Sequence, residues 1–160
     1  MTIESVLTTQ DAAPPKIGAA TPKYSAAPKY KVLLVEDNND SVAITRAFLS
    51  DPSIHLTVSA DGEQGVRAFK DSSYDLVLMD IQMPVLDGCG AALAIRRWEI
   101  ENGMIPTPIT ALTALSNASD LAKIFASGCS NYLPKPVTKP MLLQTVRQFL
   151  GSSPRGGSTQ

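Results

Sequence analysis

Short apolar runs alternate with helical patterns through the middle of the chain. Two of these runs, at residues 31–36 (KVLLVE) and 75–80 (DLVLMD), are almost continuously apolar, as is typical of parallel strands covered on both faces. A third run, IHLTVS at 54–59, alternates between apolar and polar positions, which favours a place nearer the edge of the sheet. Runs at 109–113 and 130–133 complete a set of five. The pattern predicts an α/β domain built on a five-stranded parallel sheet.

The helices between these strands are indicated by the residues at their ends. Asp61 is typical of a residue that caps the start of a helix, and the following pattern continues to about Lys70. Thr138 predicts the start of the last helix, which tolerates Pro140 in its first turn. Gly128 is expected to end the fourth helix, because glycine readily adopts the left-handed conformation found there.

Composition separates the domain from its two flanking segments. Residues 1–29 contain four prolines and only scattered apolar residues, which predicts a flexible N-terminal arm. Residues 151–160 are rich in glycine and serine, and we expect a disordered C-terminal tail. One domain, at residues 30–150, remains between them.

Charge and apolar run length exclude several classes of partner. The formal net charge of the 160-residue chain is -1, so no overall basic field favours binding to nucleic acid. No apolar stretch approaches the roughly 18 residues of a membrane span, and the N-terminus lacks the features of a secretory signal. We therefore expect a cytoplasmic protein whose two cysteines, Cys89 and Cys129, are reduced structural thiols.

Several conspicuous residues have ordinary structural interpretations. The only histidine, His55, lies within an alternating strand pattern and is not expected to donate a phosphoryl group. The helical segment AALAIRRWEIEN predicts a partly exposed Trp98 and a solvated face for Arg96 and Arg97, and its packing face is expected to consist of Leu93, Ala94 and Ile95.

Polar side chains gather where the predicted strands end. Glu36 and Asp37 follow the first strand, Asp80 ends the third, Thr113 ends the fourth and Lys135 follows the fifth. In open parallel sheets the ligand site lies at the carboxyl ends of the strands. Each pair of neighbouring carboxylates repels by roughly 4 kcal/mol at 4 Å and an effective dielectric of 20, so this cluster needs a cation. Oxygen ligands without histidine or cysteine favour Mg²⁺, and the lysine can neutralise a bound phosphate.

Four motifs occur in order along this region. They are VLLVEDN at 32–38, MDIQMPVLDG at 79–88, ALTA at 111–114 and YLPKP at 132–136. With these motifs, residues 31–150 resemble the receiver domain of two-component response regulators and hybrid histidine kinases. The resemblance implies a flavodoxin-like (βα)5 fold with the strand order 2-1-3-4-5 and helices on both faces of the sheet.

The resemblance also implies a role for each residue of the acidic site. Asp80 is expected to be the phosphoacceptor, taking a phosphoryl group from a phosphohistidine of a partner. Asp37 and Asp80 are expected to ligate Mg²⁺ together with the main-chain carbonyl of Gln82, and Glu36 to act through a metal-bound water. Lys135 is expected to pair with the phosphoryl group. Such a domain catalyses only its own phosphorylation and dephosphorylation, and is not otherwise an enzyme.

A switch of surface shape follows from the same resemblance. Thr113 is expected to move toward the phosphoryl group and Tyr132 to turn inward, which re-shapes the face formed by the fourth helix, fifth strand and fifth helix for a downstream protein target. The Lys135–Pro136 peptide is expected to be cis. Gln82 and Leu115 occupy positions that flank the path of the hydrolytic water, and we expect Leu115 to slow the entry of that water.

The implied upstream partner is a histidine kinase or a histidine phosphotransfer protein. It is expected to contact the loop after Lys135 and the first helix, through Asp40, Ser41, Ile44, Thr45 and Phe48. The sequence leaves open whether the domain is a stand-alone regulator or the receiver of a hybrid histidine kinase.

Two other functions remain as alternatives. One is a phosphotransferase or phosphatase with an aspartyl intermediate, although Gln82 stands where such an enzyme has a second acid. The other is a pseudo-receiver that binds a partner without phosphorylation, against which the intact acidic pair, threonine and lysine argue.

Overall fold

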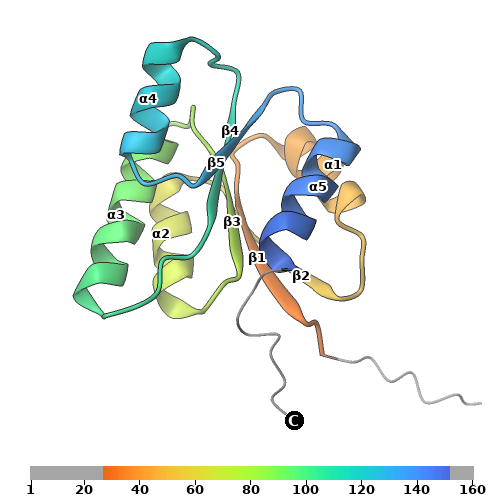
Figure 1. Ribbon diagram of the computed structural model, residues 1–160. Coiled ribbons are helices and arrows are strands. Elements are labelled where there is room, and N and C mark those ends of the chain that lie inside the picture. Colours follow the sequence, from red (N-terminus) through yellow and green to blue (C-terminus); the bar gives the residue numbers. More distant parts are fainter. Residues whose placement is uncertain (1–26, 152–160) are drawn as a thin grey trace, which may run out of the picture.

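The computed structural model describes residues 27–151, in which five strands alternate with five helices (Figure 1). The predicted arm and tail lie outside the described residues, except for residues 27–29 and Gly151. In chain order the elements are β1 (Tyr30–Val35), α1 (Asn39–Phe48), β2 (Ile54–Ser59), α2 (Gly62–Asp71), β3 (Leu76–Asp80), α3 (Gly88–Glu101), β4 (Ile109–Thr113), α4 (Ala118–Ala126), β5 (Asn131–Pro134) and α5 (Lys139–Leu150).

The strands form one parallel sheet in the order β2-β1-β3-β4-β5. This confirms the order implied by the resemblance and the edge position predicted for residues 54–59. The bounds of β2 and β4 are those predicted, whereas the other three strands are displaced by one residue at one or both ends. At the start of β3, for example, Asp75 is bonded to Lys31 through both its main chain and its carboxylate just before the ladder begins.

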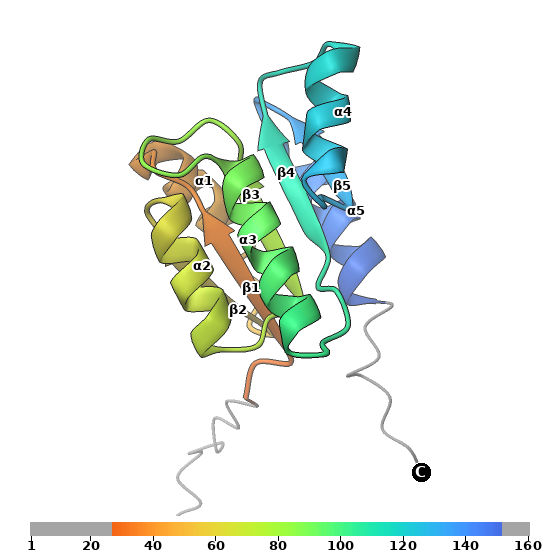
Figure 2. The same ribbon diagram turned by 90° about the vertical axis from the view of Figure 1, so that its left-hand side faces the viewer.

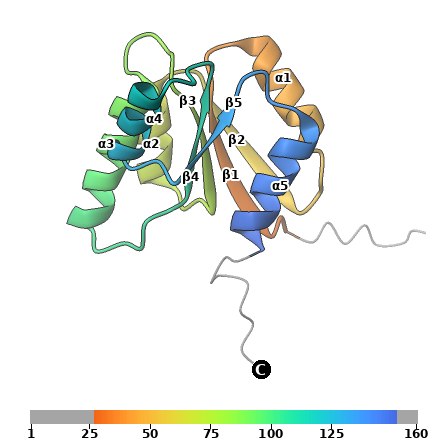
Figure 3. The same cartoon turned by 45° about the horizontal axis from the view of Figure 1, so that its top comes forward.

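Helices cover both faces of the sheet. Figures 1 and 3 show α2, α3 and α4 on one face and α1 and α5 on the other. Successive residues of β1 alternate between the two cores: Leu33 and Val35 belong to the first, and Val32 and Leu34 to the second. The nearly continuous apolar run in β1 is therefore explained by burial on both sides, as predicted.

Every helix begins at a side chain that accepts a hydrogen bond from a main-chain N–H of the first turn. The capping residues are Asn38, Asp61, Asp87, Asn117 and Thr138. These contacts satisfy donors that a helix cannot satisfy internally. No helix within residues 27–151 has the length and apolar character needed to cross a membrane.

The packing face predicted for α3 was wrong in part. Leu93 is 54% exposed, whereas Ala91 and Ile95 are fully buried and Trp98 is half-buried with its ring 5.9 Å from that of Phe69. A helical period of 3.6 residues puts positions 91, 95 and 98 on one face and turns position 93 away from it. The predicted partial exposure of Trp98 is confirmed.

The prediction for Arg96 was also wrong. Arg97 is exposed as expected, but Arg96 is largely covered and pairs with the buried carboxylate of Glu99 at 2.7 Å. Its other contacts are to main-chain carbonyls far along the sequence, so the local pattern of charges gave no sign of them. Cys89 and Cys129 are both free thiols, as predicted.

Candidate functional site

Three carboxylates converge at the carboxyl end of the sheet, as the sequence predicted. Glu36 and Asp37 follow β1, and Asp80 is the last residue of β3. One carboxylate oxygen from each lies within 4.8 Å of the others. Glu36 and Asp80 are buried, whereas Asp37 is exposed to solvent. Because β1 and β3 are parallel neighbours, their adjacent ends bring these residues together.

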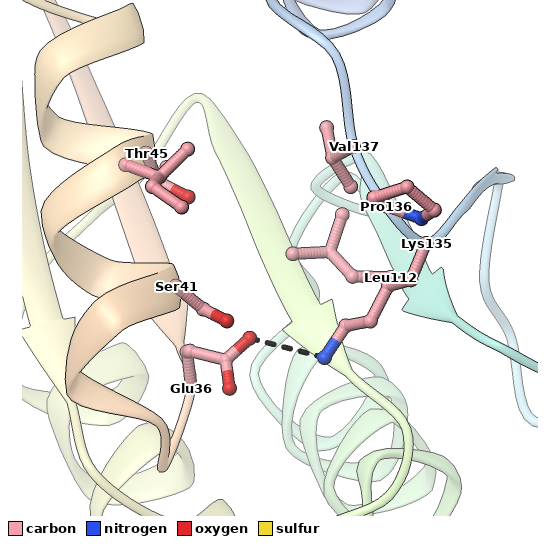
Figure 4. Close-up of a pocket in the computed structure, with 8 residues that line it drawn as sticks. Glu36, Ser41, Thr45, Leu112, Lys135, Pro136 and Val137 are labelled. Carbon is pink, nitrogen blue, oxygen red and sulfur yellow. Dashed lines mark hydrogen bonds and ion pairs between the residues drawn. The ribbon is translucent and has the colours of Figure 1, made fainter.

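Lys135 is brought into the same cluster by β5. Its Nζ lies 3.0 Å from Oδ1 of Asp80 and 3.2 Å from Oε2 of Glu36, the contact drawn as a dashed line in Figure 4. Among the described residues, Lys135 is the only cationic side chain that pairs with this cluster, and it contacts two of the three carboxylates. Three negative charges less one positive charge leave a net charge of minus two. The cluster is therefore suited to one divalent cation or to an incoming group that carries one with it.

The environment shifts the pKa of two of these groups. Burial raises the pKa of the Glu36 carboxyl, which the N–H of Asn38 opposes and the negative charge of Asp80 reinforces. Burial alone lowers the pKa of Lys135, but its contacts with Asp80 and Glu36 outweigh that effect and raise the pKa overall. The lysine therefore remains protonated at neutral pH and retains its positive charge in the site.

The loop after β3 is held tightly against Asp80. The main-chain N–H of Gln82 donates to Oδ1 of Asp80 at 3.3 Å, and that of Gly88 donates to the carbonyl of Ile81 at 3.0 Å. A Cβ atom on Gly88 would lie 2.2 Å from the Asp80 carbonyl oxygen, so only glycine fits there. Between these points Val85 adopts a φ of 73°, which is unfavourable for a β-branched residue. The loop is therefore bonded to the Asp80 carboxylate at its start and carries backbone strain at Val85.

The two predicted switch residues lie on adjacent strands. Thr113 ends β4 and is 1% exposed, and its Oγ1 accepts a hydrogen bond from the N–H of Leu115 at 2.9 Å. Tyr132 on β5 is half-buried, and its ring lies edge to face against Phe125 of α4, with ring centroids 6.0 Å apart. Sequence reasoning missed Phe125, whose large side chain is 47% exposed; an apolar residue on the outer side of the predicted fourth helix was the available signal.

The two residues predicted to set the phosphoryl lifetime lie in the loops after β3 and β4, each two residues beyond the last residue of its strand. Gln82 is exposed in the loop after Asp80, and Leu115 is half-buried against the first core in the loop after Thr113. The peptide before Pro136 is cis, as the resemblance implied.

A pocket of about 380 Å³ opens beside the acidic cluster (Figure 4). It lies between α1 and the loop after β5, and it includes three of the five residues of α1 expected to contact a partner. Its lining is formed by Glu36, Ser41, Ile44, Thr45, Leu112, Lys135, Pro136 and Val137. Ile44 is 51% exposed, so an apolar side chain is available at its rim.

The donor atoms of the cluster fit Mg²⁺. All three side chains offer carboxylate oxygens, and no histidine or cysteine takes part in the cluster among the described residues. Magnesium in proteins is commonly held by one or two carboxylates, with waters and phosphate oxygens completing its coordination. The exposure of Asp37 leaves one side of the cluster open for those ligands.

Comparisons with known proteins agree with this geometry. The sequence model of the response regulator receiver domain matches residues 32–147. The sensor protein GacS of Pseudomonas syringae is 38% identical over 130 residues, which cover 81% of this chain but only 14% of GacS. The chain thus spans a small part of the length of that curated relative, and the same holds for GacS of Pseudomonas protegens, of which 13% is covered.

Two solved structures are similar in both sequence and fold. One is the receiver domain of the sensor histidine kinase PA1611 of Pseudomonas aeruginosa, with a magnesium ion in its active site cleft; it is 36% identical with a TM-score of 0.69, and the match covers 77% of this chain and 98% of that one. The other is the receiver domain of the Saccharomyces cerevisiae response regulator Ssk1, crystallised with the histidine phosphotransfer protein Ypd1 (37% identical, TM-score 0.72, covering 76% and 89%). With its sheet order, its acidic cluster and these matches, the chain belongs to the family of response regulator receiver domains of two-component phosphorelay systems.

Proposed function

We propose that Asp80 is the phosphoacceptor of this receiver domain. The observation that carries the proposal is the unequal charge at the end of the sheet, where three carboxylates meet one lysine. Asp80 is the central member, because it ends a fully buried strand between β1 and β4 and is contacted by Lys135 and by the N–H of Gln82. Glu36 and Asp37 flank it from one side only, which suits them to binding a metal rather than to attack.

The proposed reaction is the transfer of a phosphoryl group from a phosphohistidine to Asp80. A carboxylate oxygen of Asp80 forms a bond to phosphorus as the phosphorus–nitrogen bond breaks, and the bonding electron pair returns to the imidazole. The products are an acyl phosphate on Asp80 and a histidine that takes up a proton. Such a transfer mainly requires in-line positioning and neutralisation of charge, and Lys135 is placed to pair with a phosphoryl oxygen.

Asp37, Asp80 and the main-chain carbonyl of Gln82 are the proposed direct ligands of Mg²⁺, with Glu36 acting through a bound water. When bound, the ion offsets the negative charge of the carboxylates and of the phosphoryl oxygens. Support comes from the oxygen-only donor set and from the similar PA1611 receiver domain, whose structure holds a magnesium ion in its cleft.

The proposed response begins at Thr113. Its Oγ1 accepts from Leu115, so movement of Thr113 toward a phosphoryl group breaks a hydrogen bond that holds the loop between β4 and α4. Tyr132 lies on the neighbouring strand against Phe125 of α4, and both rings are accessible at the surface. We therefore place the downstream protein contact on the face formed by α4, β5 and α5.

The proposed upstream partner presents its phosphohistidine to the pocket beside the acidic cluster. The apolar side chains of Ile44 and Val137 line that pocket, which also contains the amino group of Lys135. The similar receiver domain of Ssk1 was crystallised with a histidine phosphotransfer protein, which supports a partner of that class.

A transfer experiment tests the proposed function. The wild-type chain is mixed with Mg²⁺ and a histidine phosphotransfer protein that carries a radiolabelled phosphohistidine, and label is expected to move to the chain. Asp80→Asn is expected to take up none. Asp71→Asn, which changes an exposed aspartate at the end of α2, serves as the matched control and is expected to behave as wild type.

The same preparations test the two alternatives. Multiple-turnover hydrolysis of small phosphoesters would show a phosphatase, whereas we expect the chain to catalyse only its own phosphorylation and dephosphorylation. Absence of label on the wild-type chain would indicate a pseudo-receiver and contradict the proposal.

A further inference from the structure

Arg96 and Glu99 connect α3 with two distant segments of the chain. The Arg96 guanidinium donates to the carbonyl oxygen of Gly128 through Nε at 2.9 Å and Nη2 at 2.8 Å. Its Nη1 donates to the carbonyl of Thr107 at 2.8 Å and to Oε2 of Glu99 at 2.7 Å. Oε1 of Glu99 accepts from the N–H of Thr107 at 2.7 Å, which completes a network of five hydrogen bonds. The Glu99 side chain is 1% exposed, so this network lies inside the protein.

The shape of the chain is adapted to this network. Gly128 has a φ of 99°, and a Cβ atom there would lie 2.6 Å from Cγ of Arg96. Glycine at this position therefore permits the turn after α4 and also leaves room for the arginine. The guanidinium group donates four hydrogen bonds in one plane, to two carbonyls and one carboxylate, whereas an ammonium group has only three N–H donors and lacks the planar fork.

The network lies at the opposite end of the sheet from the acidic cluster. Thr107 comes just before β4, and Gly128 comes shortly before β5. The other ends of these two strands carry Thr113 and Lys135. Arg96 therefore holds the starting points of the two strands that present the proposed switch and phosphate-binding residues.

Helix α4 is attached to the domain mainly at its carboxyl end. Ile124 is the only buried residue of α4 and lies one turn before Gly128, and Leu121 is half-buried against the same core. Helices α2 and α3 instead bury residues along most of their length. The amino end of α4 is capped locally by Asn117, which accepts from the N–H of Asp120. Figures 1 and 2 show this end extending past the tip of β4.

We propose that Arg96 and Glu99 form a latch that fixes the carboxyl end of α4, so that its amino end is the part that moves when Asp80 is phosphorylated. The inference rests on the proposed function. The hydrogen bond from Leu115 to Thr113 is the link to the moving end, because it lies just before α4. With the latch intact, rearrangement at Thr113 displaces α4 about Gly128. With the latch loosened, the whole of α4 moves already in the unphosphorylated domain. The unphosphorylated and phosphorylated states then differ less in the motion of α4.

Arg96→Lys is the direct test, because it keeps the positive charge but removes the fork. Arg97→Lys is the matched control, since Arg97 is the exposed neighbour on the same helix. Amide hydrogen exchange is measured by mass spectrometry for residues 114–122 and 123–130, in Mg²⁺ with and without beryllofluoride, which mimics an aspartyl phosphate. Circular dichroism establishes whether each variant is folded. If Arg96→Lys does not fold, Glu99→Gln is used in its place.

In the wild type and in Arg97→Lys, beryllofluoride is expected to change exchange in 114–122 by about fivefold and to leave 123–130 within about twofold. In Arg96→Lys, exchange in 123–130 is expected to be about tenfold faster before beryllofluoride is added, and the response in 114–122 to fall to less than about half.

Two results would overturn the latch. One is exchange in 123–130 that matches the wild type, and the other is faster exchange there with an unchanged response in 114–122, which would make the pair a structural contact only. Failure of the proposed function itself gives a different result, because the wild-type chain would then not respond to beryllofluoride.

Discussion

Two clusters that each combine acidic and basic side chains lie at opposite ends of the same sheet, and they differ in their balance of charge. At the amino end, Glu99 has one cation, Arg96, and one main-chain donor, Thr107, so each carboxylate oxygen has a partner. At the carboxyl end, Lys135 is shared between Asp80 and Glu36, with Asp37 nearby. The balanced Arg96–Glu99 pair joins segments of the fold. The acidic cluster around Asp80 keeps an excess of negative charge, so it can bind a further cation. An ion pair is present at both ends, so its presence does not tell a structural contact from a binding site. The number of carboxylates relative to the number of cations does.

The two ends also differ in their backbone. Near Arg96 the left-handed conformation is adopted by Gly128, which has no side chain to oppose it. In the loop after Asp80 the left-handed conformation is adopted by Val85, which is 77% exposed and β-branched. Backbone strain is therefore avoided near Arg96 and retained in the loop after Asp80, and such strain is common near functional sites.

Replacement of a carboxylate by an amide is expected to have opposite effects on the free energy of unfolding at the two ends of the sheet. Glu99→Gln leaves Arg96 without its counter-charge and is expected to lower the free energy of unfolding by on the order of 3 kcal/mol. Asp80→Asn removes repulsion from Glu36 and Asp37 at the cost of one contact with Lys135, and is expected to raise it by about 1 kcal/mol without Mg²⁺. Urea denaturation in the presence of a chelator measures the free energy of unfolding of both variants. A change of the same sign in the two variants would contradict the expected difference between the two ends.

Magnesium is expected to stabilise the domain by binding to the acidic cluster and not to the Arg96–Glu99 network. At a concentration about 100 times its dissociation constant, Mg²⁺ adds about 2.7 kcal/mol to the free energy of unfolding. Asp37→Asn is expected to remove most of this gain because it removes a proposed ligand, whereas Glu99→Gln and the control Asp71→Asn are expected to retain it. Thermal unfolding with and without Mg²⁺ measures the effect. An equal gain in Asp37→Asn would exclude that residue as a ligand.

Relief of the strain at Val85 is expected to stabilise the domain modestly. Asparagine tolerates a φ of 73° better than valine does, so Val85→Asn is expected to raise the free energy of unfolding by about 1 kcal/mol. Ile105→Asn is the control, because Ile105 is 80% exposed and does not have a positive φ; its effect is expected to stay within about 0.5 kcal/mol. Equal effects of the two substitutions would show that strain at Val85 is not the cause.

The smallest expected effect concerns the lifetime of the phosphoryl group. Leu115 is half-buried beside Thr113, and we expect its side chain to hinder the entry of the hydrolytic water together with Gln82. Leu115→Ala is expected to speed dephosphorylation about threefold, whereas Leu93→Ala on the exposed side of α3 leaves the rate unchanged. The decay of phosphorylated chain is followed by intact mass, and no acceleration in Leu115→Ala would contradict the expectation.

The sequence predicted the acidic end of the molecule better than the latch. Glu36, Asp80 and Thr113 adjoin or end apolar strands, so the order of a parallel sheet is enough to bring them together. Arg96 instead donates to carbonyls 11 and 32 residues away, at Thr107 and Gly128, and any residue type supplies such an acceptor. Contacts between a side chain and distant main-chain atoms leave no pattern in a single sequence, whereas side chains at strand ends do.

The acceptance of a phosphoryl group by Asp80 in a magnesium-dependent site is tested by the intact mass of the chain after incubation with a small phosphodonor. We expect a gain of one phosphoryl group in the wild type with Mg²⁺, and no gain in Asp80→Asn or in the presence of a chelator. A phosphoryl group on Asp80→Asn, or none on the wild type with Mg²⁺ present, would contradict it.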